Sequence, residues 1–447
     1  MSEENGREYV QFLNMRKVTE KAESLARVEQ FFDDSVTLTD KNYMKEVKLL
    51  ATNNVLTNLL IGHTNDLAVA YNRSHNSYYR VPKRYGMDHF THRIVIDITD
   101  NMISGGFIEN KAGTYYSYDS LKDKRKVSEM LPTEKLIDWF DGANNESWGT
   151  TNRQFKDPII LKDKENSYHI KKLVDYKESQ NTKTCRQEME EYNEFISSIL
   201  LCTNQALGGI RADQTPATSR AAVPAFSSPY SKTLLSIPKL DSRLHRIWNN
   251  KNWDHGGRFY GADYQQLNEQ ERAILTIDGS PVVELDYSAL HLRMLYHLEG
   301  KDFTGDPYQA VAAGNPNIRK LLKIICLVGI NAASPVQALI AVERNKDAKP
   351  LIEKFEKSGK KLEGLLDSFK KVHHPIASKL YSGAGIELQN KDSKIAADIL
   401  SHFTKRSIPC LCVHDSFIVP QQHKGELWNA MMEMYAKHMG GFSPIVK

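Results

Sequence analysis

The segment VVELDYSALHLRMLYHLE, residues 282–299, gives the clearest indication of fold and site in this sequence. Its first residues form a short apolar strand that ends at Asp286, and the residues after Ser288 carry apolar side chains at helical spacing. A carboxylate is therefore expected where a buried strand meets a helix. Such an acid can cap the helix or act in catalysis, and this segment alone leaves both interpretations open.

A second segment, SIPCLCVHDSFIVP at 407–420, places polar residues between two apolar strands. A tight hairpin usually turns through Gly or Asn, whereas this one contains His414, Asp415 and Ser416. Polar side chains between buried strands are costly when they lack a partner. The pattern favours a metal ion or a charged ligand at Asp415, and an aspartate that caps its own turn is the alternative.

Two further segments carry basic residues. In NIRKLLKIICLVGINAAS, residues 317–334, Arg319 and Lys323 are four apart and share one face of the predicted helix. This face is either an anion-binding surface or an ordinary solvated one. In WDHGGRFYG, residues 253–261, a turn loosened by glycine precedes Arg258.

Taken in their order along the chain, the four segments resemble the family A DNA polymerases and the related single-subunit, phage-type RNA polymerases over residues 245–447. LDYSALHLR is similar to motif A of this superfamily, Arg319-x-x-x-Lys323 to motif B, and VHDS to motif C. The Asp-x-x-Gly-Arg element at 254–258 and DPYQAVA at 306–312 are similar to elements of the RNA-polymerase branch. The resemblance implies an α+β fold, with a palm sheet and helical fingers, and a template-directed nucleotidyltransferase.

The resemblance also implies a metal site. Asp286 and Asp415 would hold two Mg²⁺ ions, which Mn²⁺ can replace, with the backbone carbonyl of Tyr287 as a further ligand. Phosphoryl transfer depends on positioning and charge neutralisation, which such ions supply.

Further roles follow from the same resemblance. Arg319 and Lys323 would bind the triphosphate of a nucleoside triphosphate, and Lys323 could also protonate the leaving pyrophosphate. His414 would hydrogen-bond the primer end. Arg258 and Gln389 would contact a DNA or RNA template-primer.

Two positions depart from the family pattern. His291 stands where family A has the glutamate that excludes the ribose hydroxyl, and Leu327 stands near the aromatic that stacks on the incoming base. The choice between dNTP and rNTP therefore stays open. So do two alternatives: a single-subunit RNA polymerase or primase, and an inactive polymerase fold that serves as a nucleic-acid-binding regulator or scaffold.

Residues 1–205 are expected to form a mainly helical nucleic-acid-binding region, followed by a Pro/Ser-rich linker at 206–240 and the polymerase-like part at 241–447. The stretch 89–118 has helical spacing, then Gly105-Gly106, then two short strand patterns. This order resembles a winged helix at about 85–120, and any helix followed by a hairpin gives the same pattern.

The composition fits a soluble cytoplasmic protein. The chain has 447 residues, a net charge of +4 from 59 basic and 55 acidic residues, and five scattered cysteines, which favours a reducing compartment. No apolar run approaches the roughly 20 residues that cross a bilayer, so no membrane partner is expected. Residues 344–371 are rich in lysine and could follow a phosphate backbone or form a solvated helix.

Overall fold

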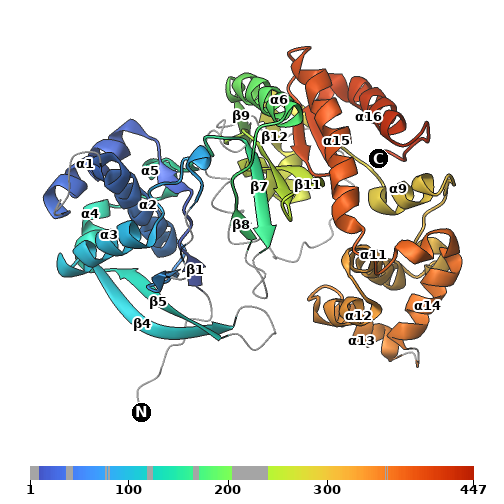
Figure 1. Ribbon diagram of the computed structural model, residues 1–447, viewed down its shortest axis with the longest axis horizontal. Helices are drawn as coiled ribbons and strands as arrows, with labels where there is room; N and C mark the ends of the chain where they lie inside the picture. The colour runs from blue at the N-terminus through green and yellow to red at the C-terminus, as the bar shows by residue number, and fades with distance from the viewer. Residues whose placement is uncertain are drawn as a thin grey trace, which may run out of the picture. The chain divides into compact units, whose positions relative to one another are not determined.

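The computed structural model describes residues 10–36, 44–75, 78, 81–117, 124–164, 171–203, 240–357, 359 and 361–447. The chain divides into two compact units, the first made of Met1–His245 with Gly261–Gly279 and the second of Arg246–Tyr260 with Ser280–Lys447. Both contain helices and strands, so the chain has the mixed α+β character expected from the sequence (Figure 1). The expected linker at 206–240 lies outside the described residues, apart from Leu240.

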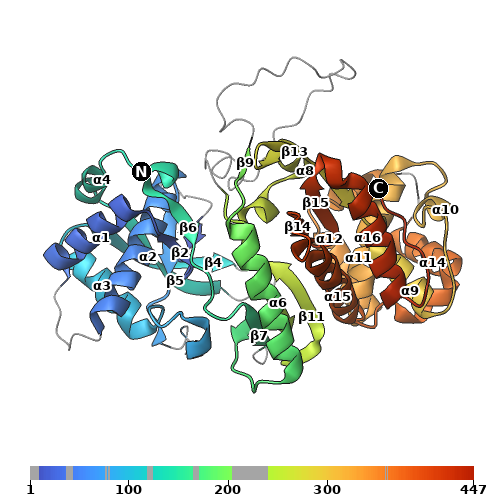
Figure 2. The ribbon, with the colours of Figure 1, turned by 90° about the horizontal axis from the view of Figure 1, so that it is seen from above.

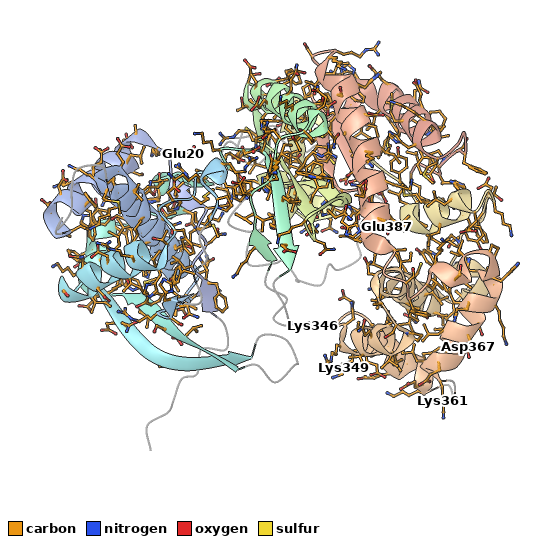
Figure 3. The ribbon with its side chains drawn as sticks, in the orientation of Figure 1. Glu20, Lys346, Lys349, Lys361, Asp367 and Glu387 are labelled. Carbon is orange, nitrogen blue, oxygen red and sulfur yellow. The ribbon has the colours of Figure 1, made fainter. Side chains whose placement is uncertain are left out.

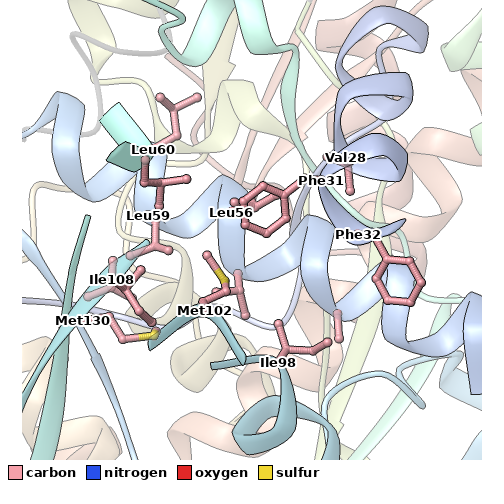
Figure 4. Packing of buried hydrophobic residues seen from close by; sticks show 14 of the residues in the cluster. Val28, Phe31, Phe32, Leu56, Leu59, Leu60, Ile98, Met102, Ile108 and Met130 are labelled. Carbon is pink, nitrogen blue, oxygen red and sulfur yellow. The ribbon is translucent and has the colours of Figure 1, made fainter. Parts of the chain in front are cut away.

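The core of the first unit lies mainly between its first three α-helices and a sheet. Its helices are α1 (Ala22–Ser35), α2 (Lys45–Thr64), η3 (Lys83–Tyr85), α3 (His92–Ser104), α4 (Glu134–Phe140), α5 (Asn145–Trp148), α6 (Gln180–Ser197), η4 (Asp263–Gln266) and α8 (Glu269–Ala273). Figure 4 shows Phe31 and Phe32 of α1, Leu56 and Leu59 of α2, and Ile98 of α3 packed into one apolar cluster. Burial of this cluster supplies the driving force for the unit.

A four-stranded sheet covers this core, in the order β1-β3-β5-β4. The strands of the unit are β1 (Val10–Phe12), β2 (Lys17–Thr19), β3 (Ala68–Tyr71), β4 (Ile108–Ser117), β5 (Lys124–Pro132), β6 (Thr150–Asn152), β7 (Ile159–Lys164), β8 (Lys171–Leu173), β9 (Leu201–Thr203) and β12 (Leu275–Ile277). The sequence predicted mainly helices here. It anticipated strands only near β4 and missed β1 and β3, which span three and four residues, too few for alternation to show.

The helix, glycine break and hairpin occur in the order predicted for 85–120. Helix α3 begins after Thr91, which caps it, and Gly105 follows its end before β4 pairs with β5. The buried face of α3, including Ile98 and Met102, packs into the core, and on its outer side Asp100 accepts from Arg73 at 2.6 Å. The helix and the glycine break therefore lie where the sequence predicted them, but β4 runs through the predicted turn at 110–113 and its partner β5 begins only at Lys124. The winged helix stays a prediction.

In the second unit, three antiparallel strands follow one another in the order β14-β15-β13. Its strands are β13 (Ser280–Asp286), β14 (Leu411–Val413) and β15 (Ser416–Pro420). Register pairs Leu285 with Phe417 and Asp286 with Ser416. Around this sheet lie α9 (Leu290–Leu298), α15 (Gly385–Thr404), η6 (Gln421–His423) and α16 (Lys424–His438), as Figure 2 shows for α15 and α16. Asp286 thus ends β13, and Asp415 lies in the turn between β14 and β15.

A hairpin of β10 (His245–Asn249) and β11 (Asn252–Tyr260) packs on α15. Gly257 has φ +90°, and a Cβ there would lie 2.8 Å from Trp248 Nε1 and 2.9 Å from Ser393 Oγ. Only glycine allows this approach. Asn390 on α15 donates to the carbonyl of Trp253 at 2.9 Å, which holds the hairpin in place.

The rest of the second unit is helical. It comprises α10 (Gln309–Ala312), α11 (Pro316–Asn331), α12 (Pro335–Arg344), α13 (Lys349–Glu356), α14 (Leu362–Val372) and η5 (His374–Lys379). Helix α11 begins at Pro316 after the capping side chain of Asn315, and it buries Leu321, Leu322 and Ile325 as the sequence predicted. In the described part of the chain, no helix is long and apolar enough to cross a membrane.

Candidate active site

Asp286 and Asp415 lie side by side at one end of the paired strands β13 and β15. Asp286 ends β13 opposite Ser416, the residue that follows Asp415. The amide of Tyr287 donates to the carbonyl of Asp415 at 3.3 Å, and the amide of Asp286 donates to the carbonyl of Lys447 at 3.0 Å. The backbone therefore holds the two aspartates in a fixed relation, as the sequence predicted from two separate motifs.

The two carboxylates interact strongly. Partial burial, followed by the like charge of Asp415, raises the pKa of Asp286 to about 7, although the side chain of Asp286 is reached by solvent. Glu284 adds to this effect, and the charge of Lys323 opposes it. Asp286 therefore carries a proton more readily than an ordinary aspartate. A cation placed between the two acids would displace that proton.

The third carboxylate, Glu284, already has a partner. Ser416 Oγ donates to Glu284 Oε1 at 2.5 Å across β13 and β15. In the described ranges, no group of three or more His, Cys, Asp or Glu side chains is arranged to hold a metal ion. The protein would therefore supply Asp286 and Asp415, and a bound ion would take its other oxygen ligands from water or from a phosphate.

His414 stands in the turn between β14 and β15. Its φ of +59° lies in the left-handed region, which explains how a turn without Gly or Asn is accommodated. The ring lies edge-on to Tyr260 at 5.4 Å, and its Nδ1 is buried with no hydrogen-bond partner among the described residues. Burial, then the charge of Arg258, lowers the pKa of His414. A neutral imidazole with an unpaired nitrogen therefore adjoins Asp415.

Arg258 and His291 meet at a residue that the sequence did not single out, Asp392. Arg258 Nε donates to both carboxylate oxygens of Asp392 at 3.0 Å, and its Nη2 donates to Oδ2. His291 Nε2 lies 2.7 Å from the same Oδ2. Arg258 Nη2 lies 3.1 Å from the same His291 Nε2. Because a guanidinium only donates and a carboxylate only accepts, this nitrogen can pair with one of the two at a time. The Asp392 side chain is 2% exposed, so this cluster is built into the unit.

The cluster also shapes the charge of the site. Burial acts to lower the pKa of Arg258, but the hydrogen bond and charge of Asp392 outweigh it, and Asp415 adds to the upward shift. Arg258 is thus a permanent cation close to Asp415. The predicted contacts of Arg258 with nucleic acid and of His291 with the sugar stay predictions.

Helix α11 brings one of its two expected cations toward the carboxylates. The charge of Lys323, whose side chain is exposed, acts on Asp286. Arg319 instead donates Nε to Asp306 Oδ2 at 2.8 Å, a pair that is about one-third exposed on both sides. Leu327, one turn beyond Lys323, is 58% exposed. Arg319 and Lys323 are one turn apart and share a face of α11, as the sequence predicted, and the exposed Leu327 continues that face.

The other expected site residues lie in or near the same unit. The phenol of Tyr287 is buried and donates to the carbonyl of Met431 at 2.6 Å, so only its backbone can face a ligand. Gln389 is half-buried on α15 beside Asn390. Arg293, in the helix that follows Asp286, is buried and donates to the carbonyls of Ser288, Phe303 and Gly305, which fixes the loop after α9.

Asp392 could have been found from the sequence. Helical spacing places it on the apolar stripe of Leu388, Ile395 and Ile399, all of which are buried. An acid inside an apolar stripe needs a buried partner. The segment QNKDSK is polar throughout, and this hid the signal.

No protein-family model and no curated protein matches the chain. Among solved structures, the chain is similar to the POL domain of Pol1 from M. smegmatis in a complex with DNA primer-template and dNTP. The TM-score is 0.28 and the sequence identity 15%, over 47% of this chain and 47% of the other. The chain thus matches about half the length of that structure, and at this level the likeness defines neither site nor activity.

Proposed function

We propose that the protein is a template-directed nucleotidyltransferase that joins a nucleoside triphosphate to a 3′-hydroxyl. The observation that carries the proposal is the Asp286–Asp415 pair, held at the end of two paired strands with the charge of Lys323 acting on it. Two adjacent carboxylates beside a cation are the arrangement that metal-assisted phosphoryl transfer requires.

The residues fit a divalent cation. Burial, and then the charge of Asp415, raise the pKa of Asp286 to about 7, and a bound cation would offset both effects. Bound Mg²⁺ would lower the pKa of the attacking hydroxyl and neutralise the triphosphate. Asp286 and Asp415 would hold the ions, with the carbonyl of Tyr287 as an added ligand.

Protein groups would perform the remaining steps. Lys323 would bind the triphosphate and could donate a proton to the leaving pyrophosphate oxygen. Arg319 would have to leave Asp306 in order to add a second contact to phosphate, since its Nε is now paired there. His414, with its unpaired Nδ1, can accept a hydrogen bond from the primer end.

Primer extension with Mg²⁺ tests the proposal, with dNTPs and rNTPs offered separately to wild type and Asp415→Asn. Asp367→Asn is the matched control, because Asp367 is an exposed aspartate on α14 (Figure 3). We expect incorporation by wild type and the control, and a loss of at least about a thousandfold in Asp415→Asn. Nucleic-acid binding without incorporation of either nucleotide would overturn the proposal and favour an inactive scaffold. Incorporation of rNTPs alone would identify an RNA polymerase or primase.

A further inference from the structure

Asp392 binds two cationic or protonatable side chains, Arg258 and His291. It is a helix residue, buried, and its carboxylate takes up Arg258 Nε and Nη2 as well as His291 Nε2. Asp392 lies on α15, and its carboxylate oxygens are already taken up by Arg258 and His291, so it is not among the proposed metal ligands. Its role must therefore act through the side chains that it binds.

Arg258 has a second acidic neighbour, Asp415. Tyr260, two residues after Arg258 on β11, has its ring 5.4 Å from that of His414, the residue before Asp415, and the charge of Asp415 acts on Arg258. A guanidinium with two carboxylates in range pairs with the one that offers the better bidentate geometry. Here that is Asp392, whose Oδ1 accepts from Nε at 3.0 Å and whose Oδ2 accepts from Nη2, while Asp415 keeps its oxygens for another partner.

We propose that Asp392 is a positioning residue that holds Arg258 away from Asp415 and thereby keeps the Asp286–Asp415 pair open to a divalent cation. Without the charge of Asp392, the guanidinium would swing to Asp415 and compete with the cation for the same oxygens. His291 completes the arrangement, because its Nε2 lies 2.7 Å from Asp392 Oδ2 and 3.1 Å from Arg258 Nη2 and so contacts both members of the pair. The inference rests on the proposed metal site.

The experiment measures Mn²⁺ binding to the full chain by electron paramagnetic resonance, without nucleotide or nucleic acid. The variants are Asp392→Asn, Arg258→Gln and the double variant. Asp398→Asn is the matched control, because Asp398 lies on the same helix and also binds a lysine and a histidine, Lys437 at 2.7 Å and His438 at 2.9 Å. Asp415→Asn defines the site, since it should abolish the specific Mn²⁺ signal.

We expect Asp392→Asn to weaken Mn²⁺ binding about tenfold, which corresponds to about 1.4 kcal/mol. Asp398→Asn should leave it within about twofold. The double variant should return to the affinity of Arg258→Gln, because the competing guanidinium is then gone. This rescue is the readout that a merely structural role for Asp392 would not produce.

Three results would overturn the inference: unchanged Mn²⁺ affinity in Asp392→Asn, an affinity in the double variant that stays at the level of Asp392→Asn, or no specific Mn²⁺ binding in wild type. If Asp392→Asn does not fold, as judged by circular dichroism, the double variant compared with Arg258→Gln carries the test. Unequal affinities in that pair would show that Asp392 acts otherwise than through Arg258. Because no nucleotide is present, Mn²⁺ binding without primer extension would sink the proposed activity and leave this inference standing.

Discussion

Asp286 lies opposite Ser416 in the antiparallel pair of β13 and β15, and this register places its carboxylate beside that of Asp415. The two motifs that contribute these acids are far apart in the sequence. Strand pairing alone brings them together, because Asp415 precedes the first residue of β15 and Asp286 is the last residue of β13. The like charges then make the pair a site that favours a cation.

The raised pKa of Asp286 predicts a pH-dependent stability. Its pKa of about 7 in the folded chain lies above the ordinary value of 3.8, so the folded state binds more protons than the unfolded state between these values. Stability should therefore fall as pH rises from about 4 to about 7, and Asp286→Asn should remove this loss. After solvent screening we expect the variant to gain about 1 kcal/mol over wild type near pH 8 and little near pH 4.

Urea unfolding at both pH values measures this gain. Asp367→Asn serves as the control, because its side chain is exposed. Parallel stability curves for wild type and Asp286→Asn across the pH range would contradict the prediction.

Lys323 should matter for the triphosphate. Replacement by methionine removes the cation whose charge acts on Asp286, and we expect the KM for nucleoside triphosphate to rise about tenfold or more, the usual loss for a charged hydrogen bond. Steady-state primer extension measures it. Lys320→Met, on the same helix and also exposed, should leave KM within about twofold. Equal effects of the two variants would remove Lys323 from this role.

Gly257 should be sensitive to any side chain. Alanine there would combine a left-handed φ of +90° with a Cβ 2.8 Å from Trp248 Nε1, so we expect Gly257→Ala to destabilise the chain by about 2 kcal/mol or more. Gly300 has φ +68° and open space around it, so Gly300→Ala should cost only about 1 kcal/mol. Thermal unfolding compares the two, and equal losses would mean that the close approach contributes nothing.

The lysine-rich helices offer a test of nucleic-acid binding. Lys346, Lys349 and Lys361 are exposed in the second unit (Figure 3). If they follow a phosphate backbone, replacing all three by glutamate should weaken binding of a labelled primer-template about tenfold or more and flatten its salt dependence. The control reverses Lys301, Lys405 and Lys424, which are also exposed and change the net charge equally. A similar loss in both variants would indicate a nonspecific charge effect.

The sequence predicted the parts of the site that follow from local pattern. A strand that ends in Asp286, a polar turn at Asp415 and a helix face with Lys323 all follow from periodicity over a few residues, and the structure brings these three together. The pairing of Arg258 with Asp392 could not be predicted in this way. It joins a hairpin to a helix more than a hundred residues later, and only tertiary packing decides which of several acids an arginine selects.

The division of the chain has a practical consequence for dissecting it. Residues 261–279 belong with the first unit although they lie between two parts of the second. Asp263 Oδ2 accepts from the amide of Asp241 at 3.0 Å, and Leu275 pairs with Thr203 in β9. A fragment that starts at 241 would carry this excursion without its strand partner and expose it to aggregation.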